Sequence, residues 1–250
     1  MGLSDCMGKS LFNSCAKYYD FIEPKEDIRK NSLFISKLLN RFGVKYILEI
    51  GCGTGSFLIQ LKKLGFDVQG LDFSKGMLKE ARKKSKIKLY HKDMSNFKIN
   101  KKYDAIICIG SSLLALPNFK LIRKTIQNSY NHLNKNGIIF LDLPNHRREI
   151  RQCNNKKEHV SYKIPKGRLE SIFLSYKKGN KWVEVWNGSV KEGGKVSKFV
   201  DIWEEVIYSP KELEASLKNT GFNIFRIYGS MKGEKFDENK SWRRIYLCQK

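Results

Sequence analysis

The chain has 250 residues, a length that suits one large domain or a core with an insertion. It is 41% hydrophobic and 12% aromatic, which excludes a disordered or collagen-like protein. No apolar stretch approaches the roughly 18 residues of a membrane-spanning helix, and the N-terminal residues lack the apolar core of a signal peptide. We therefore expect a soluble, cytoplasmic protein.

The charge is strongly basic, with 48 Lys and Arg against 25 Asp and Glu and a formal net charge of +23. A basic balance of this kind can reflect binding to nucleic acid, to an anionic membrane or to an acidic small molecule, or it can reflect only a solvated surface. The lysines are scattered along the chain, which favours the solvated surface. The cysteines form no C-x-x-C pair, so we expect reduced thiols and no metal site at Cys6, Cys15, Cys52, Cys108, Cys153 and Cys248.

Helical and strand patterns alternate through the first 145 residues. Apolar residues at three- and four-residue steps predict an amphipathic helix over 25–42, and a continuous apolar run over 46–50 predicts a strand buried on both faces. This alternation is typical of an α/β protein with a doubly wound, Rossmann-like, mostly parallel sheet. The same patterns predict helices over 57–64, from 74 onward and over 119–133, and strands over 66–72, 88–91, 103–109 and 137–143.

The alternation stops after Pro144. Residues 145–166 are polar and are expected to be irregular, and residues 168–208 predict three or four antiparallel strands joined by glycine turns. A capped helix then starts at Ser209, followed by closing strands over 222–228 and 244–248. We expect an N-terminal helical cap over 1–44, a core over 45–145 and 207–250, and a small antiparallel β insertion over 146–206.

A glycine-rich segment, 51–55, follows the first predicted strand at the edge where parallel sheets bind ligands. It lacks the third glycine of the dinucleotide fingerprint and the lysine of a Walker loop. Acidic residues accompany three successive strands. Glu49 lies in the first, Asp72 ends the second where an acid can accept bonds from ribose hydroxyls, and Asp93 follows the third beside Met94. That pair can bond an exocyclic amine and cover a purine face.

Together these segments resemble the class I S-adenosylmethionine-dependent methyltransferases. The similarity lies in residues 49–55, 71–78, 93–94, 103–108 and 133–140, and it covers roughly 15–143. It implies S-adenosyl-L-methionine as the cofactor. The segment 109–112 lacks the Asn/Asp-Pro-Pro-Tyr/Phe sequence of many amino-methylating nucleic-acid enzymes, which argues against base methylation of that kind.

The resemblance also implies roles for single residues. Residues 51–53 would approach the methionine part of the cofactor, Asp72 would hold the ribose beside Phe73, and Asp93 with Met94 would contact adenine. Residues 108–111 would line the path to the methyl group, and Tyr19 would close over the cofactor. The cofactor-binding residues implied in this way are Tyr19, Glu49, Gly51, Cys52, Gly53, Asp72, Phe73, Met77, Asp93, Met94, Cys108 and Gly110.

Methyl transfer needs an oriented and deprotonated acceptor. His146, just past the fifth predicted strand, is the candidate base, and the alternative is a loop histidine bonded to backbone or water. The basic run that follows could recognise a phosphate or carboxylate of the acceptor or could be a solvated loop; it holds Arg147, Arg148 and Arg151. Aromatic residues of the insertion could wall an acceptor pocket, pack on the core or pair with a second subunit; these are Trp182, Trp186, Trp203 and Tyr208.

The sequence therefore predicts a methyltransferase that acts on an amine or hydroxyl of a small-molecule metabolite, with an anionic acceptor as one option. The insertion resembles the lid of small-molecule N- and O-methyltransferases, so a homodimer through it is a further option. Nucleic acid is not favoured, and neither a membrane nor a metal is expected. The alternatives are an RNA or protein methyltransferase, which the +23 charge suggests, and a catalytically silent cofactor-binding module.

Overall fold

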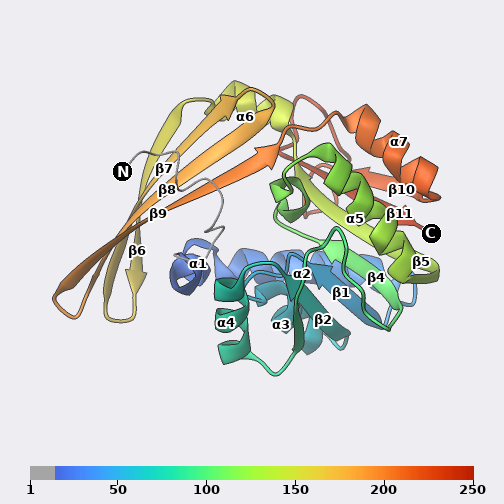
Figure 1. The fold of residues 1–250 in the computed structure, drawn as a ribbon, viewed down its shortest axis with the longest axis horizontal. Helices are drawn as coiled ribbons and strands as arrows, with labels where there is room; N and C mark the ends of the chain where they lie inside the picture. The colour runs from blue at the N-terminus through green and yellow to red at the C-terminus, as the bar shows by residue number, and fades with distance from the viewer. Residues whose placement is uncertain (1–14) are drawn as a thin grey trace.

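A seven-stranded sheet forms the centre of the computed structural model, which describes residues 15–250 (Figure 1). Its strand order is β10-β11-β5-β4-β1-β2-β3, and β11 is antiparallel to both of its neighbours. The strand order reverses between β1 and β4, and a crevice at such a switch point is where open α/β sheets bind ligands. The strands are β1 (Tyr46–Ile50), β2 (Asp67–Asp72), β3 (Lys88–His91), β4 (Tyr103–Cys108), β5 (Leu133–Pro144), β10 (Asn223–Tyr228) and β11 (Arg243–Gln249).

Helices cover both faces of this sheet, which confirms the doubly wound, mostly parallel fold. One face carries α2 (Lys25–Asn40), α3 (Ser56–Lys63) and α4 (Lys75–Lys84), and the other carries α5 (Phe119–His132) and α7 (Pro210–Thr220) (Figure 1). Side chains alternate between the two cores along β4: Ala105 and Ile107 join one apolar cluster, and Ile106 and Cys108 join the other. The continuous apolar run in the sequence follows from this burial on both sides.

A second, antiparallel sheet follows β5 in the chain. It has the order β6-β7-β8-β9 and is called the lid sheet below. The short helix α1 (Ala16–Ile22) packs against it (Figure 1). Its strands are β6 (Lys156–Ile164), β7 (Gly167–Lys178), β8 (Lys181–Glu192) and β9 (Lys195–Val206).

The expectation that residues 145–166 are irregular was wrong. They hold α6 (His146–Cys153) and β6. Strand β6 lies at the edge of the lid sheet and exposes most of its residues, so it shows no apolar alternation. Helix α6 buries His146 and no aliphatic side chain, so it lacks an apolar stripe.

The predicted helix boundaries rest on ordinary capping. Ser74 accepts from the Met77 amide at the start of α4, and Ser209 accepts from the Glu212 amide at the start of α7. Gly221 ends α7 in the left-handed conformation. Cys15, Cys52, Cys108, Cys153 and Cys248 are unpaired, and Cys6 lies outside the described residues. Within residues 15–250, no helix has both the length and the apolar character needed to cross a bilayer.

Asp104 in β4 joins three segments at one edge of the sheet. Its carboxylate accepts from the backbone amides of Lys45 and Tyr46 at 3.0 and 2.9 Å and from the side-chain amide of Asn134 at 2.7 Å. Burial raises the pKa of this carboxyl, but the three hydrogen bonds outweigh burial and bring the pKa below its usual value. The stabilisation is therefore present above the normal carboxyl pKa and disappears as the pH falls through the lowered one.

Replacing Asp104 with Ala should lower the free energy of unfolding by about 1–3 kcal/mol at pH 7, because three donors lose a charged acceptor. Urea unfolding across pH measures this, and the deficit should vanish in acid. Asp67→Ala is the matched control, since the Asp67 side chain is 56% exposed and contacts Lys101 at 3.7 Å only. An Asp104→Ala deficit no larger than that of the control would contradict the assignment.

Candidate active site

The glycine loop after β1 sits tightly against the exit of β4. Gly51, Gly53 and Gly55 all have positive φ, at 72°, 52° and 76°. A Cβ at Gly51 would lie 2.6 Å from the Ser112 Cβ and 3.3 Å from the Met94 Cε. A side chain at Gly51 would therefore clash with the exit of β4. The loop, called the glycine cradle below, leaves its main chain open to close approach by a ligand.

Asp72 ends β2 and holds this loop in place. Its Oδ2 accepts from the Gly53 amide at 2.8 Å, and its Oδ1 accepts from the Ser74 amide at 2.7 Å. Burial raises the pKa of Asp72, and these backbone hydrogen bonds oppose that rise. Each carboxylate oxygen keeps a second lone pair that can accept from a ligand hydroxyl.

Glu49 supplies a buried carboxyl beside the loop. It is 3% exposed, and its Oε2 has no hydrogen-bond partner among the described residues. Burial raises its pKa well above the ordinary value, and the nearby charges of Glu23 and Asp72 add to the effect. A buried oxygen without a donor indicates a missing partner. This oxygen and the glycine cradle fit the ammonium-bearing methionine end of S-adenosylmethionine.

Helix α1 is attached to the same loop. Asp20 accepts from the hydroxyls of Thr54 and Ser56, the latter at 3.2 Å. Burial, and after it the nearby charge of Glu23, raise the pKa of the neighbouring Tyr19 well above its ordinary value. Tyr19 therefore precedes the residue that bonds the glycine loop, and its contact with the cofactor stays a prediction.

The other residues implied by the resemblance fall into two groups. Asp93 and Met94 are half-buried, with Asp93 accepting from the Ser95 amide at 2.7 Å, and Phe73 is 67% exposed. Cys52, Met77 and Cys108 are buried instead. The Cys108 side chain packs in the apolar core. The cofactor contacts of all these residues stay predictions.

A network at the exit of β4 escaped the sequence analysis. Asp142 accepts from the Gly110 amide at 3.0 Å and from Arg243 at 2.7 Å, and Arg243 also donates to the Ser111 hydroxyl at 3.1 Å. Ser111 has a positive φ of 64°. Asp142 stands near the end of β5, where the logic applied to Asp72 could have found it; Arg243 is 101 residues away and gave no local signal.

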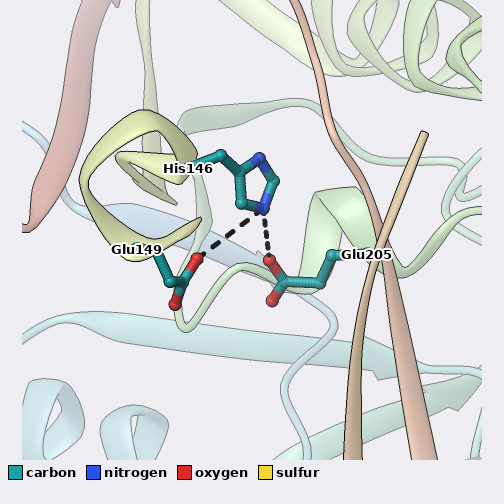
Figure 2. A group of neighbouring side chains, drawn as sticks. All are labelled: His146, Glu149 and Glu205. Atoms are coloured by element: carbon teal, nitrogen blue, oxygen red, sulfur yellow. Dashed lines mark hydrogen bonds and ion pairs between the residues drawn. The ribbon is translucent and has the colours of Figure 1, made fainter. Parts of the chain in front are cut away.

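His146 lies at the start of α6 in a cluster with two glutamates (Figure 2). It is 5% exposed, and its Nε2 is 3.1 Å from Glu205 and 3.9 Å from Glu149. Glu205 also hydrogen-bonds with the Ser111 side chain, which connects the cluster to the exit of β4. The histidine is therefore bonded to a carboxyl, neither to backbone nor in an open loop. Glu149 follows it by one helical turn, whereas Glu205 comes from β9.

Burial separates the pKa values within this cluster. It lowers the pKa of His146 to about 4 despite the nearby charge of Glu149. Burial together with Glu205 raises the pKa of Glu149 to about 7, and burial together with Glu184 raises that of Glu205 to about 8. At neutral pH the imidazole is uncharged, and the carboxyls are the groups that gain or lose a proton.

The arginines after His146 contact the segment between β10 and β11. Arg147 pairs with Glu238 at 3.1 Å, the Arg148 guanidinium lies 4.2 Å from the Trp242 ring centre, and Arg151 donates to the Asn239 carbonyl at 3.1 Å. They hold α6 against the core. Tyr208 also serves the core, because it is buried and donates to the Pro144 carbonyl at 3.3 Å.

Gly51→Ala and Gly53→Ala should differ in their effect on stability. Both positions have positive φ and share a strain of about 1–2 kcal/mol. Only a Cβ at Gly51 meets other atoms, whereas one at Gly53 has nothing within 4 Å. Overpacking adds about 1–3 kcal/mol at Gly51. Urea unfolding of both variants measures the difference, and equal losses would contradict the tight cradle.

Comparisons with known proteins agree with this geometry. Residues 47–137 match the model of a family described as a methyltransferase domain. The chain is 35% identical over 137 residues to a glycine/sarcosine N-methyltransferase of Halorhodospira halochloris, covering 52% of this chain and 51% of that protein. It spans about half the length of the glycine/sarcosine N-methyltransferases that it matches.

Two further matches extend over more of the chain. A dTDP-3-amino-3,4,6-trideoxy-alpha-D-glucopyranose N,N-dimethyltransferase of Streptomyces venezuelae is 23% identical over 199 residues, covering 75% of this chain and 79% of that protein. The crystal structure of an S-adenosylmethionine-dependent methyltransferase from Clostridium acetobutylicum superposes with a TM-score of 0.82 at 22% identity, covering 95% and 98% of the two chains. Residues 47–137 thus match a methyltransferase domain, and the chain has the fold of the S-adenosylmethionine-dependent methyltransferases.

Proposed function

We propose that this protein transfers a methyl group from S-adenosylmethionine to an amine or hydroxyl of a small-molecule metabolite. The observation that carries the proposal is the buried, unpartnered Glu49 oxygen beside a glycine cradle at the switch point of the sheet. The relatives named for N-methylation of glycine, sarcosine and an amino sugar support the small-molecule class.

The protein's own residues would bind and orient the reactants. When bound, the cofactor supplies an electrophilic methyl group on a sulfonium. Glu49 would pair with its ammonium, Asp72 would accept from its ribose hydroxyls, and the loop from Gly51 to Gly53 would follow its methionine part. Alignment of two reactants in this way can lower a barrier by about 7–11 kcal/mol.

The groups on the acceptor side favour a small molecule over nucleic acid. Glu149 and Glu205 both contact His146, and Glu184 lies diagonally across the lid sheet from Glu205, so this region offers mainly carboxyls and not the cations that a phosphate backbone would need. The +23 charge then belongs to the outer surface. An anionic acceptor and a homodimer through the lid sheet stay predictions.

His146 and Glu205 are the proposed proton acceptors for the incoming nucleophile. His146 is neutral at pH 7 because burial brings its pKa to about 4, and a base that weak gives little driving force. Glu205, with a pKa raised to about 8, is the stronger base of the pair, but it is mostly protonated at pH 7 and becomes available as a base only as the pH rises through about 8. The 3.1 Å contact lets the two share one proton.

Asp72→Ala tests the cofactor site through the ribose. Calorimetry should compare S-adenosylhomocysteine with its 2′,3′-dideoxy analogue. The wild-type protein should prefer the hydroxylated ligand by more than 1 kcal/mol, because a charged acceptor is matched by two donors. The variant should lose that preference. If Asp72→Ala weakens both ligands equally, the residue only holds the glycine loop and the ribose assignment is wrong.

A radiolabelled methyl-transfer screen tests the acceptor class. Metabolite pools and tRNA pools are incubated with the wild-type protein and with Asp72→Ala as the matched blank. Label should enter small molecules and should fall at least tenfold with the variant. Label confined to tRNA would overturn the small-molecule class, and no transfer despite tight S-adenosylhomocysteine binding would identify a silent module.

A further inference from the structure

A cavity of about 100 Å³ lies between α1 and the lid sheet. Its walls combine aromatic rings with carboxylates and come from α1, β7, β8 and β9. The part used here is called the acceptor chamber and is lined by Tyr19, Phe173, Glu184, Trp186, Asp201 and Trp203.

The strand register explains why these two kinds of side chain meet. Phe173 pairs with Trp186, Trp186 with Asp201, and Glu184 with Trp203, so all of them project from the same face of the lid sheet. This face turns towards α1, because Tyr19, Trp186 and Phe173 belong to one apolar cluster. Glu204, one residue along β9, lies on the opposite face and pairs with Lys181 at 3.7 Å.

The acceptor chamber adjoins both parts of the candidate active site. Tyr19 of the chamber is followed by Asp20, whose carboxylate accepts from Thr54 and Ser56 at the glycine loop. On the other side, Glu205 lies two residues past Trp203 on β9 and diagonal to Glu184, so both glutamates project from the same face, and Glu205 contacts His146 at 3.1 Å.

The carboxyls here outnumber the donors that serve them. His146 Nε2 carries at most one hydrogen, yet two carboxyls lie within 3.9 Å of it. The Glu149 Oε2 atom is buried and has no hydrogen-bond partner among residues 15–250. Arg243, the cation that faces Glu205, already pairs with Asp142 at 2.7 Å. A protonated carboxyl can supply one donor within this cluster, and a positively charged ligand in the adjoining chamber would supply another.

We propose that the acceptor is an amine and that its ammonium group binds in the acceptor chamber, against the Trp186 and Trp203 rings and the Glu184 carboxylate. This inference rests on the proposed function and narrows its acceptor from amine or hydroxyl to amine. Ring faces attract cations, and more strongly so out of water. A neutral hydroxyl gains nothing comparable, and an anionic group would be repelled by the same carboxylates.

Two probes of similar size separate charge from shape: tetramethylammonium and tert-butanol. Calorimetry on the full chain saturated with S-adenosylhomocysteine should show tetramethylammonium binding at least tenfold more tightly than tert-butanol. Glu184→Gln should weaken tetramethylammonium about tenfold, and Trp203→Leu should weaken it several-fold. Glu204→Gln, the control on the opposite face, should bind as the wild type does. Equal binding of the two probes, or equal effects of Glu184→Gln and Glu204→Gln, overturns the proposal.

Cofactor affinity keeps this test separate from the proposed function. All variants should bind S-adenosylhomocysteine within twofold of the wild type, which also shows that they fold. If S-adenosylhomocysteine does not bind the wild type, the proposed function fails. If it binds, but alcohols are methylated as well as the matched amines, only the proposal about the acceptor chamber fails.

The competing occupant of this region is a divalent cation held by His146, Glu149 and Glu205. Tetramethylammonium binding that is unchanged by EDTA and is lost when Zn²⁺ is added supports the chamber. Tetramethylammonium binding that requires a metal overturns it.

Discussion

The clasp between Asp72 and the glycine loop is the interaction on which the site depends. One carboxylate joins the Gly53 amide to the Ser74 amide, and so fixes the end of β1 relative to the start of α4. On its other side the loop meets Ser112, where no Cβ could fit at Gly51. The loop is therefore held from two sides by groups that also face the ligand. A substitution of Asp72 therefore affects both the position of the loop and the proposed binding of the ligand.

The site is acidic within a strongly basic chain. Glu49, Glu149 and Glu205 are all raised in pKa, in each case chiefly because burial disfavours the charged form. Carboxyls held in this way cost stability in the protein alone, and the proposed ligands would offset this cost by bringing donors or positive charge. The sulfonium cofactor and an amine acceptor both do so. The net charge of +23 says little about this partner, because it is summed over the whole chain and not over the site.

Local patterns were enough to predict most of the core, and they failed where contacts are distant. The apolar run of β1, the glycine loop and Asp72 all lie within residues 46–72. Their spacing along the sequence was enough to predict that they meet at one edge of the sheet. His146 was found by its place after β5, but its partner Glu205 is 59 residues away on a strand with no special motif. Likewise β6 is an exposed edge strand, and it buries too few side chains for its sequence to show the alternation of apolar and polar residues that predicts a strand. The backbone of β4 was predicted, but the burial of the Cys108 side chain follows from which face of the sheet it occupies.

Helix α1 makes the cofactor site and the acceptor chamber one unit. With seven residues it is too short to be stable alone, so its position depends on what it touches. On one side Asp20 bonds the glycine loop through Thr54 and Ser56. On the other side the Cys15 amide donates to Asp201 at 3.0 Å, and Tyr18 stacks on Phe199 at 5.6 Å between ring centres. Contacts that order the loop therefore also order the wall of the chamber. If the acceptor binds in the chamber as proposed, the glycine loop that would hold the methyl donor is then already ordered, and this is the orientation that the reaction requires from the protein.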